Sequence, residues 1–69
     1  MHGTIVRIKA DRGFGFVRPT DDRGDGDHFF HVSSLVDLVF EERLVNQAVE
    51  FDSTLGGKGL VATNIRRGN

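Results

Sequence analysis

The segment RGFGFV, residues 12–17, alternates aromatic side chains with glycines. Phe14 and Phe16 would share one face of a β-strand, because successive side chains of a strand point to opposite faces. Such rings can pack in a hydrophobic core or stack against another flat group. Glycine inside a strand usually marks a bulge or a group that approaches the backbone closely. Gly13 and Gly15 therefore favour a ligand on this face.

A second aromatic segment, HFFHV, covers residues 28–32. Alternation puts Phe29 and His31 on one face, and we assign Phe30, on the other face, to the core. Pairing of the two aromatic strands would create an aromatic platform of Phe14, Phe16, Phe29 and His31, flanked by Arg7, Lys9 and Arg12. Base–aromatic stacking contributes about 1–3 kcal/mol per base. The surface therefore predicts binding of single-stranded nucleic acid with modest sequence preference.

The formal net charge of −1 hides an uneven distribution of charge along the chain. Residues 1–18 hold four basic residues against one acid, and residues 56–69 hold three basic residues and no acid. Residues 19–27 carry four aspartates against one arginine, and residues 28–55 carry five acids against one arginine. This pattern indicates a basic face on an acidic body, although ordinary solvated surface charge would look the same.

Five short strands are predicted, separated by the turns DRG, TDDRGDGD and GGKG. They cover residues 4–10, 14–18, 27–32, 47–53 and 59–66. One short helical turn is expected near residues 33–36, followed by a loop. Five strands in 69 residues favour a small closed barrel or a sandwich with one core. The residues that we expect inside are Ile5, Ile8, Val17, Phe30, Val49, Phe51, Val61 and Ile65.

Several kinds of site and location are disfavoured by the composition. There are no cysteines, so disulfides and thiolate metal sites are excluded. No apolar run approaches the roughly 18 residues of a membrane span, and residues 1–10 lack the core of a secretion signal, so we expect a cytoplasmic protein. The acidic segment 21–28 has Arg23 where a calcium loop needs a ligand. His28 fits a strand-edge residue, and we expect no metal, no cofactor and no enzymatic activity.

Three segments together resemble the bacterial cold-shock proteins and related cold-shock domains. ADRGFGFV (residues 10–17) is similar to the family's first ribonucleoprotein motif, and DHFFHVSSL (residues 27–35) resembles the second. QAVEFDSTLGGKGLVATNIR (residues 47–66) fits the last two strands. The resemblance implies an all-β protein with one domain over residues 1–69, a five-stranded antiparallel oligonucleotide-binding barrel. It also implies binding of single-stranded RNA and DNA, as an RNA chaperone and a regulator of transcription or translation.

The resemblance also implies roles for individual residues. It assigns phosphate contacts to Arg12 and Lys58, and it places Arg7 and Lys9 at equivalent surface positions with different side chains. The stacking groups that it implies are Phe14, Phe16, Phe29, His31 and Phe40. The chain departs from the family where Arg7 replaces a tryptophan, Val32 replaces an aromatic residue and Leu60 replaces a common proline. Two missing stacking groups predict weaker affinity than that of a typical member.

Two other functions compete with single-strand binding. An RNA-recognition-motif domain also uses a strand like RGFGFV, but it needs two helices and places its other aromatic motif upstream. The apolar run LVDLVF (residues 35–40) would instead suit a protein-interaction or dimerisation module. We expect a monomer that binds neither membranes nor a small-molecule substrate, and leave open whether residues 35–45 mediate dimerisation.

Overall fold

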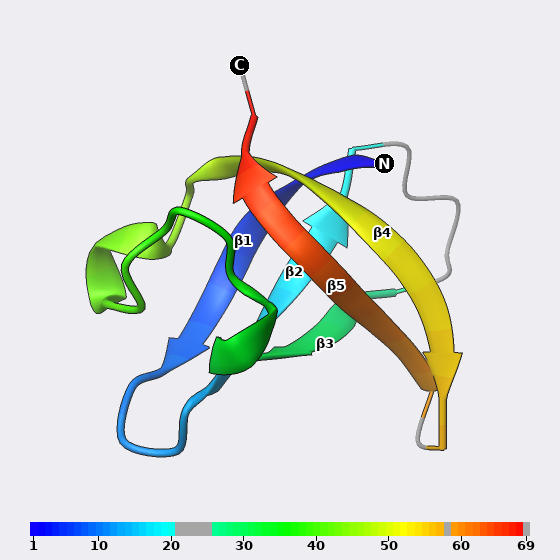
Figure 1. The fold of residues 1–69 in the computed structure, drawn as a ribbon, viewed down its shortest axis with the longest axis horizontal. Coiled ribbons are helices and arrows are strands. Elements are labelled where there is room, and N and C mark those ends of the chain that lie inside the picture. Colours follow the sequence, from blue (N-terminus) through cyan, green and yellow to red (C-terminus); the bar gives the residue numbers. More distant parts are fainter. Residues whose placement is uncertain (21–25, 58, 69) are drawn as a thin grey trace.

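Five strands form a closed barrel in the computed structural model, which describes residues 1–20, 26–57 and 59–68. Around the barrel the strands follow the order β1-β2-β3-β5-β4 (Figure 1). Neighbouring strands pair antiparallel, as predicted, except β3 and β5, which run parallel. The strands are β1 (His2–Lys9), β2 (Phe14–Pro19), β3 (His28–His31), β4 (Ala48–Gly56) and β5 (Gly59–Arg67). The all-β barrel expected from the sequence is confirmed.

The connections combine one tight turn with two short 3-10 helices. Between β1 and β2, the N–H groups of Arg12 and Gly13 donate to the Lys9 carbonyl at 3.0 and 2.9 Å, and Gly13 adopts a φ of 74°. That φ favours glycine, so the turn explains this residue. The predicted helical turn is present as η1 (Val32–Ser34). A second turn, η2 (Glu42–Leu44), was not predicted.

The core lies inside the barrel and matches most of the predicted set. The predicted residues that are fully buried are Ile5, Val17, Phe30, Val49, Phe51 and Ile65. Ile8 is half-buried and packs against this cluster. Leu44 of η2 and Ala62 of β5 complete the core, and neither was predicted. Val61 was placed inside wrongly, because it is only half-buried and Ala62 is the buried neighbour.

A bulge in β5 explains the error at Val61. The register between β4 and β5 shifts so that two residues, Asn64 and Ile65, lie opposite the single residue Phe51. Asn64 has a φ of 51°, a left-handed conformation that asparagine tolerates better than most residues. Strict alternation is therefore broken, and Ala62 and Ile65 both point inward although they are three residues apart. Val61 consequently faces outward.

Gly15 is a glycine because the interior of the barrel leaves no room for a side chain at this position. A Cβ atom there would lie 2.5 Å from the carbonyl oxygen of Arg7 and 2.8 Å from two ring carbons of Phe30. Gly15 is buried, so it faces the interior, opposite to Phe14 and Phe16. The group that approaches this glycine is the protein's own core ring. Gly15 is therefore no evidence for a ligand on the outer face, and the interpretation of this glycine from the sequence was wrong.

His28 is a core residue rather than the strand-edge residue expected. It is 2% exposed, and its ring lies edge-on to Phe51 with the centroids 5.3 Å apart. Its Nε2 atom is 2.8 Å from the hydroxyl oxygen of Ser53. Within the described residues, its Nδ1 atom has no hydrogen-bond partner. The histidine thus links β3 to β4 across the interior.

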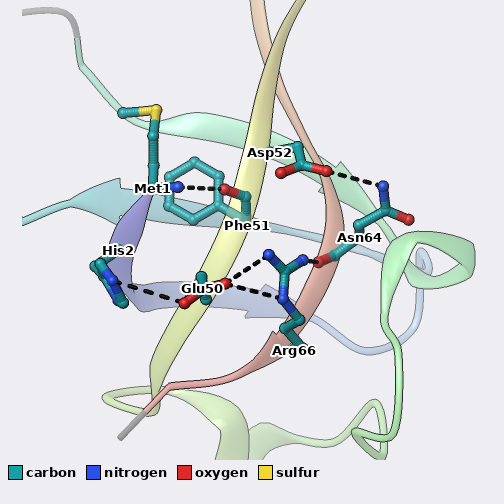
Figure 2. A network of polar contacts seen from close by, with 7 residues as sticks. All are labelled: Met1, His2, Glu50, Phe51, Asp52, Asn64 and Arg66. Carbon is teal, nitrogen blue, oxygen red and sulfur yellow. Dashed lines mark hydrogen bonds and ion pairs between the residues drawn. The ribbon is translucent and has the colours of Figure 1, made fainter.

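Polar contacts join β1, β4 and β5 on the side of the barrel shown in Figure 2. Two nitrogens of Arg66 donate to one oxygen of Glu50, at 3.1 and 2.6 Å, and His2 lies 3.6 Å from the other oxygen. The hydrogen bond from Arg66 lowers the pKa of the Glu50 carboxyl. The ionised Glu50 carboxylate therefore stabilises the fold fully at pH values above the ordinary carboxyl pKa. This contribution is lost as the pH falls through the lowered pKa of Glu50. At the bulge, the Asn64 amide donates to Asp52 at 3.0 Å.

Within residues 1–20, 26–57 and 59–68, no helix has the length and apolar character needed to cross a membrane. In the same ranges, no three histidine, cysteine or acidic side chains gather where they could hold a metal ion.

Candidate nucleic-acid interface

Three phenylalanine rings form a compact cluster on the outer face of β2 and β3. The centroids of Phe14 and Phe29 are 5.4 Å apart, and each lies 6.0 Å from the centroid of Phe16. Phe14 and Phe29 are inclined by only 33°, whereas Phe16 meets both nearly edge-on. Phe29 is 38% exposed, and the other two rings are half-buried. The structure therefore brings together the three rings predicted from strand alternation.

Strand register places cations beside these rings. Arg7 of β1 pairs with Phe16, and Lys9 pairs with Phe14. An extra residue in β1, Val6, shifts the register between Ile5 and Arg7. This bulge lets Arg7 lie level with Phe16 on the outer face. A guanidinium and an ammonium thus flank the aromatic cluster on the β1 side, as predicted.

His31 lies opposite Phe14 at the end of β3 and completes the predicted aromatic platform. Its Nδ1 atom accepts a hydrogen bond from the Ser33 N–H at 3.2 Å and lies 3.0 Å from the Ser33 hydroxyl oxygen. The ring therefore caps η1 while remaining exposed. An accepting Nδ1 requires that the neutral ring carries its proton on Nε2. The cap fixes both the orientation and the tautomer of this exposed ring.

Two hollows adjoin the aromatic platform. A polar hollow of about 210 Å³ is lined by Lys9, Asp11, Arg12 and Phe14, which places Arg12 beside the platform. A larger groove of about 420 Å³, the hairpin groove, is lined by Phe16, Phe29, Gly57, Gly59, Leu60 and Val61. Its β5 wall was not predicted, because the bulge that turns Val61 outward has no clear signal in the sequence other than Asn64.

The remaining predicted residues are not all brought to this surface. Phe40 is half-buried and packs edge-on against the core ring of Phe30, at 6.5 Å between centroids. Lys58 lies outside the described residues. Arg66 was counted toward the basic face, but it is held by Glu50. Of the cations predicted for the site, the structure therefore places Arg7, Lys9 and Arg12 beside the platform.

The barrel, the paired aromatic strands and the flanking cations agree with the comparison to known families. The family model "'Cold-shock' DNA-binding domain" matches residues 1–67. The chain belongs to the cold-shock domain family. Membership implies nucleic-acid binding, a function to which the platform is chemically suited.

Several curated relatives match almost the whole chain. The chain is 37% identical over 65 residues to the major cold shock protein of Micrococcus luteus, covering 94% of both chains. It is also 37% identical to the cold shock-like protein CspG of Escherichia coli K12, covering 94% of this chain and 90% of that protein. A solved structure titled drosophila Unr CSD456 is similar, with a TM-score of 0.74 and 27% identity. This match covers 99% of the present chain and 26% of that larger one.

Proposed function

We propose that this chain binds single-stranded RNA and DNA through the outer face of β1, β2 and β3. In this proposal residues 1–69 act as one domain and as a cytoplasmic monomer, without catalysis. The bases stack on the aromatic platform, and Arg7, Lys9 and Arg12 contact phosphates. Transient binding of this kind suits an RNA chaperone and a regulator of transcription or translation.

The cluster of Phe14, Phe16 and Phe29 is the observation that supports this proposal. Three phenylalanines contact one another on the outside of a barrel whose core already holds Phe30 and Phe51. A duplex hides the faces of its bases, whereas a single strand can present them to aromatic rings. The site therefore favours single strands over duplexes.

Alanine at Phe14, Phe16 or Phe29 is expected to weaken binding of oligo-dT by about 1–3 kcal/mol each, because each ring supplies a stacking surface. Fluorescence polarisation with labelled oligo-dT, oligo-U and a duplex measures the effect, and circular dichroism checks the fold. Val39→Ala provides a control, because Val39 is an apolar side chain that is 71% exposed and belongs to the loop between the 3-10 helices. Unchanged affinity in all three phenylalanine variants would exclude the platform as the binding surface.

Arg7→Trp is expected to tighten oligo-dT binding at about 200 mM salt. Arg7 is exposed and lies level with Phe16, so an indole there would extend the stacking surface. Each phosphate contact contributes about 0.7 to the slope of log affinity against log salt for single strands. Titrations at several salt concentrations should show a slope smaller by about that amount. Weaker binding of the folded variant at every salt concentration would indicate that Arg7 has another role.

Dimerisation through residues 35–40 is a second candidate function. Some side chains of this apolar run pack against the core, but others are exposed to solvent. Leu35, Leu38 and Phe40 pack against the core, but Val36 is 42% exposed and Val39 is 71% exposed. Sizing chromatography with and without oligonucleotide separates the two functions. A dimer that Val39→Asp converts to a monomer without loss of oligo-dT binding would support an additional association surface.

A further inference from the structure

One titratable side chain lies in the core, away from the aromatic platform. Among the described residues, His28 is the only polar residue that is buried. Its backbone pairs with that of Val17 in β2, and its ring meets Phe51 of β4 edge-on. Its Nε2 atom lies 2.8 Å from the hydroxyl oxygen of Ser53, also in β4. The ring therefore packs inside the barrel, between β3 and β4.

The hydrogen-bonding groups around His28 suit only the neutral form of the ring. A neutral imidazole has one N–H group and one acceptor nitrogen, and a hydroxyl group can serve either of them. The contact with Ser53 is therefore compatible with both neutral tautomers. A second ring proton would make both nitrogens donors. Within the described residues Nδ1 has no hydrogen-bond partner, so the protonated ring would carry a buried donor without an acceptor.

The charged groups on the neighbouring strands offer the ring no counter-charge. The acids closest to His28 and Ser53 in the chain are Asp27 and Asp52, which are exposed and bind Arg18 and Asn64. Among the described residues, every other side chain buried in the core is apolar. The Met1 ammonium, which donates to the carbonyl of the residue before Asp52, is itself a cation. A charge on the His28 ring would thus be buried without compensation.

We propose that His28 makes the stability of the barrel sensitive to mild acid. A histidine in contact with water gains its ring proton between about pH 8 and pH 5. Burial in the apolar core disfavours the charged form, whereas the unfolded chain takes up the proton freely. The unfolded state then binds more protons than the folded state, so the free energy of unfolding falls as the pH falls.

Two other titratable groups near this part of the barrel act differently. Arg66 lowers the pKa of Glu50, so the Glu50 carboxylate stays ionised throughout the range in which histidines titrate. His2 lies 3.6 Å from Glu50, and its protonation would stabilise the folded state in acid. The effect of His2 therefore has the opposite sign to that of His28.

The aromatic platform depends on the same strand. Phe29 directly follows His28 in β3, and it points outward where His28 points inward. Unfolding of the barrel in acid would therefore disperse the platform. This step rests on the proposed function: single strands would be released as His28, which they do not touch, takes up a proton.

Urea unfolding followed by circular dichroism at about pH 7.5 and about pH 5.5 tests the proposal. The variant His28→Phe puts an apolar ring in place of the imidazole. Between these two pH values, the equilibrium constant of unfolding should rise about tenfold more in the wild type than in His28→Phe, as expected for one proton. His31→Phe is the same substitution at an exposed histidine, and it should keep most of the wild-type pH dependence. Equal pH dependence of the wild type and His28→Phe would overturn the proposal.

Nuclear magnetic resonance of the histidine ring nitrogens gives a second test, which needs no variant. In the folded wild-type protein, we expect the signals of His2 and His31 to shift as the pH is lowered, because both rings are exposed. The signals of His28 should remain those of a neutral ring until the protein unfolds. A His28 ring that titrates in the folded protein together with the two exposed histidines would refute the proposal.

Binding of oligo-dT at increasing temperature, at about pH 5.5, tests the coupling to function. The wild type should lose binding at a lower temperature than His28→Phe. Loss of binding at the same temperature in both proteins would refute the coupling. A wild-type protein that binds no oligo-dT at any pH would refute the proposed function, and the urea and resonance measurements would still decide the role of His28.

Discussion

Phe30→Ala is expected to leave the protein largely unfolded at room temperature. The ring is fully buried at the centre of the barrel, beside Gly15 of β2 and edge-on to Phe40. Truncation of a buried phenylalanine to alanine costs about 3–5 kcal/mol. The whole stability of so small a domain is of similar size, roughly 5 kcal/mol. Urea titration followed by circular dichroism should therefore show little or no folded baseline.

Phe29→Ala is the matched control for this prediction. Phe29 is the preceding residue of the same strand, but it points outward and is 38% exposed. We expect the Phe29→Ala protein to unfold cooperatively with a midpoint close to the wild-type value, and to bind oligo-dT more weakly. A Phe30→Ala protein with the wild-type urea midpoint would contradict the placement of this ring in the core.

Gly15→Ala is expected to destabilise the fold by about 3 kcal/mol, the upper part of the range for overpacking. The new methyl carbon would lie 2.5 Å from the Arg7 carbonyl oxygen and 2.8 Å from the Phe30 ring. Neither neighbour can give way easily, because one is backbone within a paired strand and the other fills the core. Thermal and urea unfolding measure the loss.

Gly57→Ala serves as the comparison. A Cβ at Gly57 would meet no atom of the described residues within 4 Å, and its φ lies outside the range that favours glycine. We expect its unfolding midpoint to remain within experimental error of the wild type. If Gly15→Ala were equally neutral, the close approach of Phe30 to β2 would be wrong.

The sequence predicts the strands well because their signals are local. Alternating apolar residues and turns rich in glycine and aspartate located five strands within a few residues of their observed ends. Alternation also separated Phe29 from Phe30, and so it identified both a core residue and a surface ring in one strand. Here each residue's own neighbours in the chain determine its orientation.

The errors arise where orientation depends on distant residues. The bulge at Asn64 reverses the alternation in β5, which turned Val61 outward and Ala62 inward. His28 was read as a strand-edge residue because its polar partner, Ser53, lies 25 residues away. Leu44 enters the core from a 3-10 turn that has no periodicity to detect. None of these placements follows from local sequence alone.

In the candidate site, too, some features follow from local sequence and others depend on distant residues. The aromatic platform comes from β2 and β3, which are adjacent strands with clear alternation, and it was predicted ring by ring. The wall of the hairpin groove requires the parallel pairing of β3 with β5, which no local pattern reveals. Arg18 and Asp27 form an ion pair at 3.0 Å because of the register between β2 and β3. The sequence alone did not predict which acidic residue would pair with Arg18.

Closure of the barrel has a consequence for how the protein folds. β1, β2 and β3 are consecutive in sequence, but β1 also pairs with β4, and the Met1 ammonium donates to the Phe51 carbonyl fifty residues away (Figure 2). The chain loses conformational entropy when such distant segments come together, and it does so before their contacts can form. This loss slows folding. A peptide containing only β1–β3 would carry all four platform residues without the strands that cover its inner face. We therefore expect the platform to become ordered only in the complete chain, once β1 has paired with β4.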